Sequence, residues 1–204
     1  MNDCCNHDGE LETLRERQSG TLKVVLTINA VMFLVIVAAG LYAGSAALLS
    51  DSLDNFGDAL TYALSLYAVN LGARMKARVA FFKGLLILLA ALVVVGQIGY
   101  KLTNPAVPMF EVMGVFSLLG LAANSVCLAL LWRHRTEDVN MSSVWECSRN
   151  DIASNLAVLV TAGGVWATGS GWPDLLVASC LVVLFLRSAS RVLSAARAEL
   201  HGTT

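Results

Sequence analysis

Long hydrophobic runs separated by short polar stretches dominate the chain. A helix that crosses a bilayer needs about 20 predominantly apolar residues, and six segments approach or reach that length. The fifth continues a helix that begins near residue 143, and the last extends toward residue 193. The pattern predicts an all-α fold, a six-helix transmembrane bundle. Its predicted spans are 24–42, 45–71, 84–100, 112–132, 152–167 and 173–186.

Composition favours the same class of protein. Of the 204 residues, 56% are hydrophobic and only 14% are charged, whereas ordinary soluble domains have about 25% charged residues. We expect a flexible cytoplasmic segment over residues 1–20, one transmembrane domain over 21–195 and a short cytoplasmic tail over 196–204. The first run lies too far from the start, and is too long, for a cleaved signal peptide. A net charge of −1 offers no basic surface for nucleic acid.

Basic residues indicate how the predicted helices are oriented. Thirteen of the 14 lysines and arginines lie before the first span, after the last, or in the connections after the second and fourth spans; only Lys101 lies on the other side. Positive charges concentrate on the cytoplasmic side of membrane proteins. We therefore predict that both termini are cytoplasmic, in a multi-pass protein of the bacterial inner membrane.

Three aspartates interrupt the second hydrophobic run. Each acid costs about 2.5 to 3.5 kcal/mol near the centre of a membrane helix, more than neighbouring leucines return. Asp51, Asp54 and Asp58 are spaced i, i+3 and i+7, so they share one side of a helix, with Asn55 beside them. This stripe should face the bundle interior, where the acids either hold protons or surround a cation. A structural pairing with a basic helix face is less favoured, because we expect no lysine or arginine within a span to meet it.

A second polar pair begins the fifth run. Cys147 and Asp151 are one helical turn apart, and a thiolate with a carboxylate suits zinc or a softer divalent ion such as cadmium. Two ligands from each of two helices would make a tetrahedral site. Cys147 as a small buried hydrophobic residue and Asp151 as a helix-capping acid remain alternatives.

At these residues the chain resembles the cation diffusion facilitator family. The family's second helix typically has Gly-Ser, eight residues, a first metal ligand, three residues and an aspartate; Gly44, Ser45, Asp54 and Asp58 match this spacing. Its fifth helix has histidine, three residues and aspartate, where this chain has Cys147 and Asp151. The segments "NDIASNLAVLVTAGG" and "GWPDLL" also look like the family's fifth and sixth helices. The resemblance covers residues 20 to 195.

The resemblance implies efflux of a divalent cation, Zn²⁺ or Cd²⁺, from the cytoplasm in exchange for protons by alternating access. The transport site would be Asp54, Asp58, Cys147 and Asp151, with Asp51 and Asn55 as neighbours that shape it or relay protons. No prosthetic group is expected. The partners are the metal ion, protons and the lipid bilayer, with a homodimer left open.

Two departures qualify what the family implies. Cys147 stands where histidine is common, so metal preference and proton stoichiometry stay open. The chain ends about ten residues after its last predicted helix, which is typical of a short form without the cytoplasmic C-terminal domain of many members.

Residues Cys4, Cys5 and His7 form a second candidate metal feature. They could capture a soft cation in the cytoplasm, or they could belong to a disordered polar tail. A second function also stays open: a membrane-embedded metal sensor or chaperone that binds a cation without transporting it. An enzyme is not expected, because the sequence has no HExxH pair and its three histidines lie outside the predicted spans.

Overall fold

The computed structural model describes the backbone of residues 4–68, 73–132 and 139–201. Side chains are described for residues 19–66, 78–132 and 151–200, apart from Ser65, Ala195 and Glu199. The described residues form six helices, which confirms the predicted all-α bundle. They are α1 (Cys4–Ala43), α2 (Ala46–Ala68), α3 (Ala73–Thr103), α4 (Phe110–Trp132), α5 (Val139–Thr168) and α6 (Trp172–His201). The division into residues 1–20, 21–195 and 196–204 stays a prediction.

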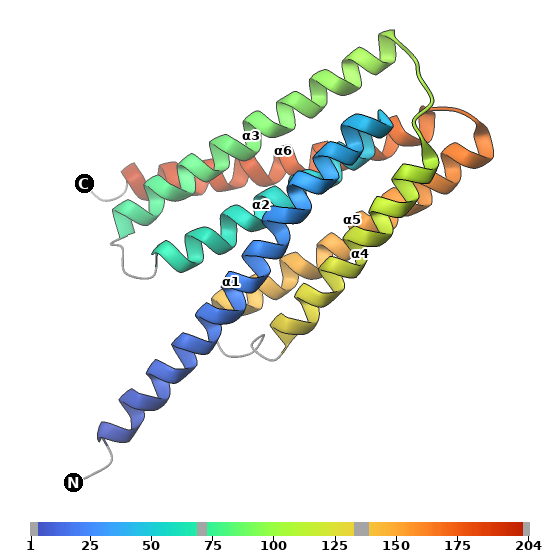
Figure 1. Cartoon of the computed structure of the whole chain (residues 1–204). Helices are drawn as coiled ribbons and strands as arrows, with labels where there is room; N and C mark the ends of the chain where they lie inside the picture. The colour runs from blue at the N-terminus through green and yellow to red at the C-terminus, as the bar shows by residue number, and fades with distance from the viewer. Residues whose placement is uncertain (1–3, 69–72, 133–138, 202–204) are drawn as a thin grey trace.

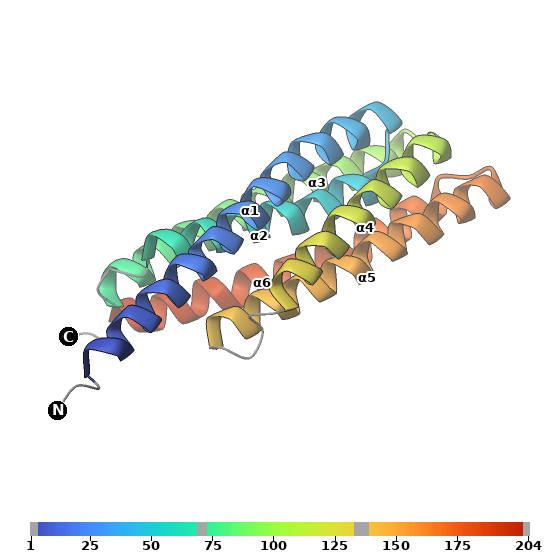
Figure 2. The same ribbon diagram turned by 60° about the horizontal axis from the view of Figure 1, so that its bottom comes forward.

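The helices run along one common direction, with both chain termini at the same end (Figures 1 and 2). We call this end the terminal end, and the other the turn end, where α1 meets α2, α3 meets α4 and α5 meets α6. The helices α3 and α6 lie side by side, as do α4 and α5, and α2 lies in the interior between them. The long helix α1 packs against α2 and α4. An even number of helices therefore returns the chain to the end where it began.

Two glycines make the tight connections at the turn end. Gly44 and Gly169 have φ values of +60° and +59°, a left-handed conformation that costs glycine little because it has no Cβ. The connection between α3 and α4 is longer and contains Pro105 and Pro108.

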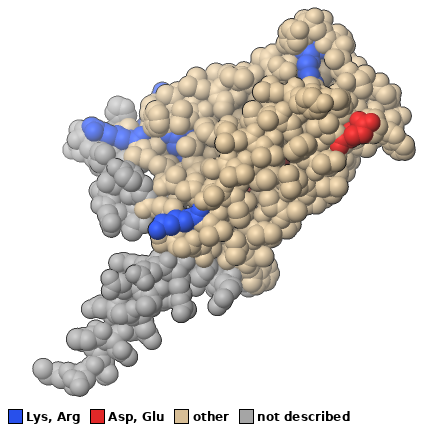
Figure 3. Space-filling model, viewed as in Figure 1, with Lys and Arg blue, Asp and Glu red and all other residues tan. Residues whose placement is uncertain are grey.

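The outer faces of the helices are apolar and exposed, as they should be in lipid. Val93 on α3 and Val160 on α5 are both 74% exposed. Among the described residues, four helices have segments long and apolar enough to cross a membrane: α1, α3, α4 and α6. On the face seen in Figure 3, charged side chains gather at the two ends and leave an uncharged band between them.

Buried side chains form cores on both sides of α2. One cluster joins it to α1, α4, α5 and α6 through residues such as Ile36, Leu48 and Val158. Another joins Leu49 and Leu53 of α2 to Val182 of α6 and to α3. The helix α2 is thus packed against neighbouring helices on two sides, and none of its described side chains is exposed.

Candidate metal-binding site

The acids of α2 and the acid of α5 come together inside the bundle. Asp51, Asp58 and Asp151 are 0%, 7% and 3% exposed, and Asp54 is half-buried. Asp151 lies close enough to all three aspartates of α2 for direct electrostatic repulsion. The stripe predicted at i, i+3 and i+7 therefore faces protein, on the side of α2 that meets α5.

Neighbouring polar groups surround these carboxyl groups. The carboxyl group of Asp58 lies near that of Asp151, and Asp54 lies near Ser154. The fully buried Tyr62 hydroxyl donates to Asp58 Oδ2. Our reading of the sequence missed Tyr62 and Ser154. Tyr62 follows Asp58 by one helical turn, so the same spacing argument that grouped the aspartates could have found it.

Several polar atoms in this region are buried without a hydrogen-bond partner. They include both carboxylate oxygens of Asp51, both side-chain polar atoms of Asn55, and Oδ2 of both Asp54 and Asp151. Burying such atoms unpaired costs several kcal/mol on water-to-hydrocarbon scales, about 4 to 8 for a neutral group. A bound cation would supply the missing partner for the carboxylate oxygens. The donor set described here consists of hard oxygen atoms, which suit divalent cations.

A cleft of about 1210 Å³ opens beside three of the acids. Asp54, Asp58 and Asp151 line it together with the middle of α6, whereas Asp51 and Asn55 do not. Asp54 and Asp58 thus border the cleft, and Asp51 lies one turn nearer the start of α2. The cleft gives a hydrated ion a route to the buried carboxylates.

Lys83 also lines this cleft. Its ammonium group donates to Thr61 of α2 and is close enough to attract Asp58 electrostatically. The expectation that no basic residue would meet the acidic stripe is therefore wrong. The helix α3 begins at Ala73, about three turns earlier than the apolar run, and this places Lys83 inside the helix.

The ligand set expected from the sequence is only partly described. Among side chains that the structure describes, no three histidine, cysteine, aspartate or glutamate residues converge closely enough to hold a metal ion. The side chain of Cys147 lies outside the described residues, although its backbone belongs to α5. The side chains of Cys4, Cys5 and His7 lie outside them as well.

Comparison with known proteins agrees with this arrangement. Residues 22–201 match the family described as the cation efflux transmembrane domain. The chain belongs to this family. As a cation efflux transmembrane domain it is a multi-pass membrane protein, which confirms the localisation predicted above, in the bacterial inner membrane. The resemblance to cation diffusion facilitators is confirmed by the same match.

Individual relatives of this domain are distant. It is 23% identical over 172 residues to the metal cation efflux system protein CzcD of Cupriavidus metallidurans, covering 78% of this chain and 54% of the relative. It is also 23% identical over 199 residues to the zinc transporter ZitB of Yersinia pestis, covering 91% of this chain and 64% of the relative. The chain thus spans between about half and two thirds of the length of these relatives.

Proposed function

We propose that this protein exports a divalent metal cation, Zn²⁺ or Cd²⁺, from the cytoplasm in exchange for protons. The observation that carries the proposal is the set of carboxylates on α2 and α5 that line one cleft with unpartnered buried oxygens. Membership of the cation efflux family and the similarity to a zinc transporter support the choice of cargo. Transport, rather than catalysis, is the function proposed.

The proposed ligands are Asp54, Asp58, Cys147 and Asp151. Asp58 and Asp151 already lie near each other, and Asp54 would turn from Ser154 toward them when a cation enters. A thiolate from Cys147 would complete a tetrahedral set and favour Zn²⁺ or Cd²⁺ over Mg²⁺. Asp51 and Asn55, one layer deeper, would shape the site or pass protons.

Exchange with protons follows from the chemistry of these ligands. Carboxylate and thiol groups must lose protons to bind a metal, so proton binding expels it. A cation entering from the terminal end, which the positive-inside pattern assigns to the cytoplasm, would be released when the ligands are protonated from the other side. One site can therefore couple the two fluxes.

The test uses purified protein in liposomes with an acidic lumen. Zn²⁺ or Cd²⁺ added outside should accumulate inside, and a protonophore that collapses the pH gradient should abolish accumulation. Asp58→Asn and Asp151→Asn should each reduce the rate of metal accumulation at least about 100-fold, because each removes a proposed metal ligand. Glu111→Gln, which neutralises an exposed acid on α4, is the matched control and should transport normally.

The same assay separates transport from simple binding. A metal sensor or chaperone would bind the cation in detergent, with Asp58→Asn weakening it, yet would move none across the liposome membrane. That result would contradict the proposed transport. Unchanged uptake by both aspartate variants would instead contradict the assigned ligands.

A further inference from the structure

One buried carboxylate joins three helices at the turn end, away from the proposed metal site. Asp174, in the first turn of α6, has 0% of its surface exposed. It accepts hydrogen bonds from Ser45 Oγ at 2.6 Å, Ala46 N at 2.9 Å and Ala47 N at 3.0 Å. It also forms an ion pair with Lys101 Nζ at 2.9 Å. Few carboxylates in a membrane domain would be so fully paired without a role.

Three of these donors belong to the start of α2. The first amides of a helix have no partner within it, and the helix dipole favours a negative charge there. Asp174 satisfies the amides of Ala46 and Ala47, while Ser45 Oγ accepts from Leu48 N at 3.1 Å. The residue therefore holds the first turn of the helix that carries the buried aspartates.

Lys101 attaches a third helix to the same point. It lies in the last turn of α3, is 6% exposed, and also donates to the Gly44 carbonyl oxygen in the turn between α1 and α2. Burial of such a pair is tolerated because both charges are matched, and removing one partner leaves the other charge buried and uncompensated. The ion pair thus fixes the ends of α2, α3 and α6 to one another.

Contact between α2 and α6 changes along their length. Near the turn end they touch, with Ser50 Oγ 3.4 Å from the Ala178 carbonyl oxygen and with Leu53 packed against Val182. From Asp54 onward the cleft separates them. The two helices are therefore in contact near the turn end and separated by the cleft in their middle parts.

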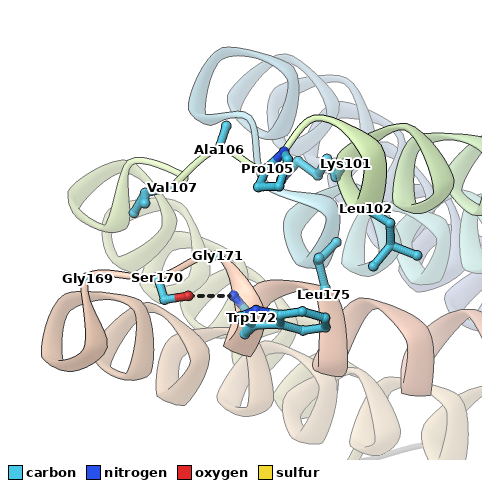
Figure 4. A pocket seen from close by; sticks show the side chains of 10 residues that line it. All are labelled: Lys101, Leu102, Pro105, Ala106, Val107, Gly169, Ser170, Gly171, Trp172 and Leu175. Carbon is cyan, nitrogen blue, oxygen red and sulfur yellow. Dashed lines mark hydrogen bonds between the residues drawn. The ribbon is translucent and has the colours of Figure 1, made fainter.

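A smaller cavity reaches the ion pair from the turn end. It has a volume of about 190 Å³ and is lined by Lys101, Pro105, Gly171 and Trp172 among others (Figure 4). Its walls come from the end of α3, the loop before α4 and the start of α6. Water from the turn end can approach Lys101 without crossing the packed layer between Ser50 and Ala178.

We propose that Asp174 and Lys101 are positioning residues for cation transport, whose ion pair holds α2 against α6 and separates when the site opens toward the turn end. This inference rests on the proposed function, because only a transporter needs the turn end to open. The pair stabilises the state described here, and its loss shifts the population toward an open turn end. Neither residue touches the cation in this state.

The test places a cysteine at the closed contact. Ser50→Cys puts a thiol at a fully buried position between α2 and α6. In intact cells, a membrane-impermeant maleimide should label this cysteine slowly, with the parent chain as the baseline for the native cysteines. Adding Lys101→Met should raise the labelling rate about tenfold, within the usual range of conformational coupling. Asp174→Asn, which removes the charge and keeps an oxygen for capping, should act in the same direction.

Two controls separate positioning from general damage to the fold. Lys101→Arg keeps the charge and should label at the Ser50→Cys rate, and Leu102→Met alters the neighbouring residue without touching the pair. The inference would be overturned if Ser50→Cys alone and both charge variants labelled at equal rates while transport fell, because the pair would then have a purely structural role. Rapid labelling of Ser50→Cys alone would also overturn it. If the parent protein moves no metal and the charge variants still label faster, the ion pair holds α2 against α6 as inferred. That result would overturn only the proposed metal transport.

Discussion

At the scale of single residues, Asp58 is the most constrained member of the acidic group. It lies near Asp151, accepts a hydrogen bond from Tyr62, and is attracted by Lys83. Groups that hold a metal ligand in place commonly change metal affinity when they are removed, although they never touch the metal. Tyr62 and Lys83 should therefore influence the site in opposite directions.

Replacing Tyr62 by phenylalanine removes one hydroxyl and keeps the ring in the core. We expect metal affinity to fall about tenfold, because Asp58 loses the donor that orients it. Titration of the purified protein with Zn²⁺ measures the change. Tyr100→Phe removes a hydroxyl from an exposed tyrosine of α3 and should leave affinity as it was. Equal affinities in both variants would show that Tyr62 only packs.

Replacing Lys83 by methionine should have the opposite effect. The ammonium group is a tethered cation beside the acids, so it competes electrostatically with a bound dication. We expect affinity for Zn²⁺ to rise about 3- to 10-fold in low salt and less in high salt. Arg78→Gln makes the same change in net charge at an exposed position on α3. A rise of the same size in Arg78→Gln would attribute the effect to overall charge, not to Lys83.

At the scale of elements, close packing of α3 on α6 forms the wall of the cleft opposite α2 and α5. Gly84 permits this contact, since a Cβ built there would lie 3.0 Å from Leu193 Cγ. Small residues allow such approaches between membrane helices. The two helices are joined again at the turn end by the ion pair of Lys101 and Asp174, so they are suited to move as one unit.

Gly84→Leu should separate these helices and destabilise the protein. Overpacking of this kind costs about 1–3 kcal/mol, which corresponds to a fall of about 2–12 °C in Tm for a chain of this length. Thermal unfolding in detergent measures it. Gly99→Leu places the same side chain on the same helix where nothing lies within 4 Å, and should change Tm little. Similar losses at both positions would show that the contact with Leu193 is not the cause, because helix propensity alone favours leucine over glycine.

Local patterns predicted the elements well, and they predicted the acidic stripe for the same reason. Both depend on residues close in sequence: apolar runs of bilayer length, and the i, i+3, i+7 spacing of Asp51, Asp54 and Asp58. The cluster around Asp174 could not be found in this way. Asp174 is separated from Ser45 by 129 residues and from Lys101 by 73, so their meeting depends on how three helices pack.

At the scale of the whole molecule, polarity is divided between the ends and the interior. Both termini lie at one end, the acids line a cleft between the middle parts of the helices, and the turn end carries the buried ion pair of Lys101 and Asp174. Apolar faces surround both features. This division suits a protein that must expose its acids to one side of a membrane at a time, because an open path at both ends would let ions leak.

The sidedness of the molecule gives the last prediction. The positive-inside pattern places the terminal end in the cytoplasm. Lys101 is the one lysine or arginine at the opposite end of the spans. Thr103→Cys at the end of α3 and Ala198→Cys near the end of α6 are both exposed positions. In a background without Cys4, Cys5, Cys127 and Cys180, an impermeant maleimide should label Thr103→Cys in intact cells. Ala198→Cys should be labelled only in inverted vesicles, because α6 ends where the chain began. The reverse pattern would contradict the predicted orientation, in which the terminal end lies in the cytoplasm.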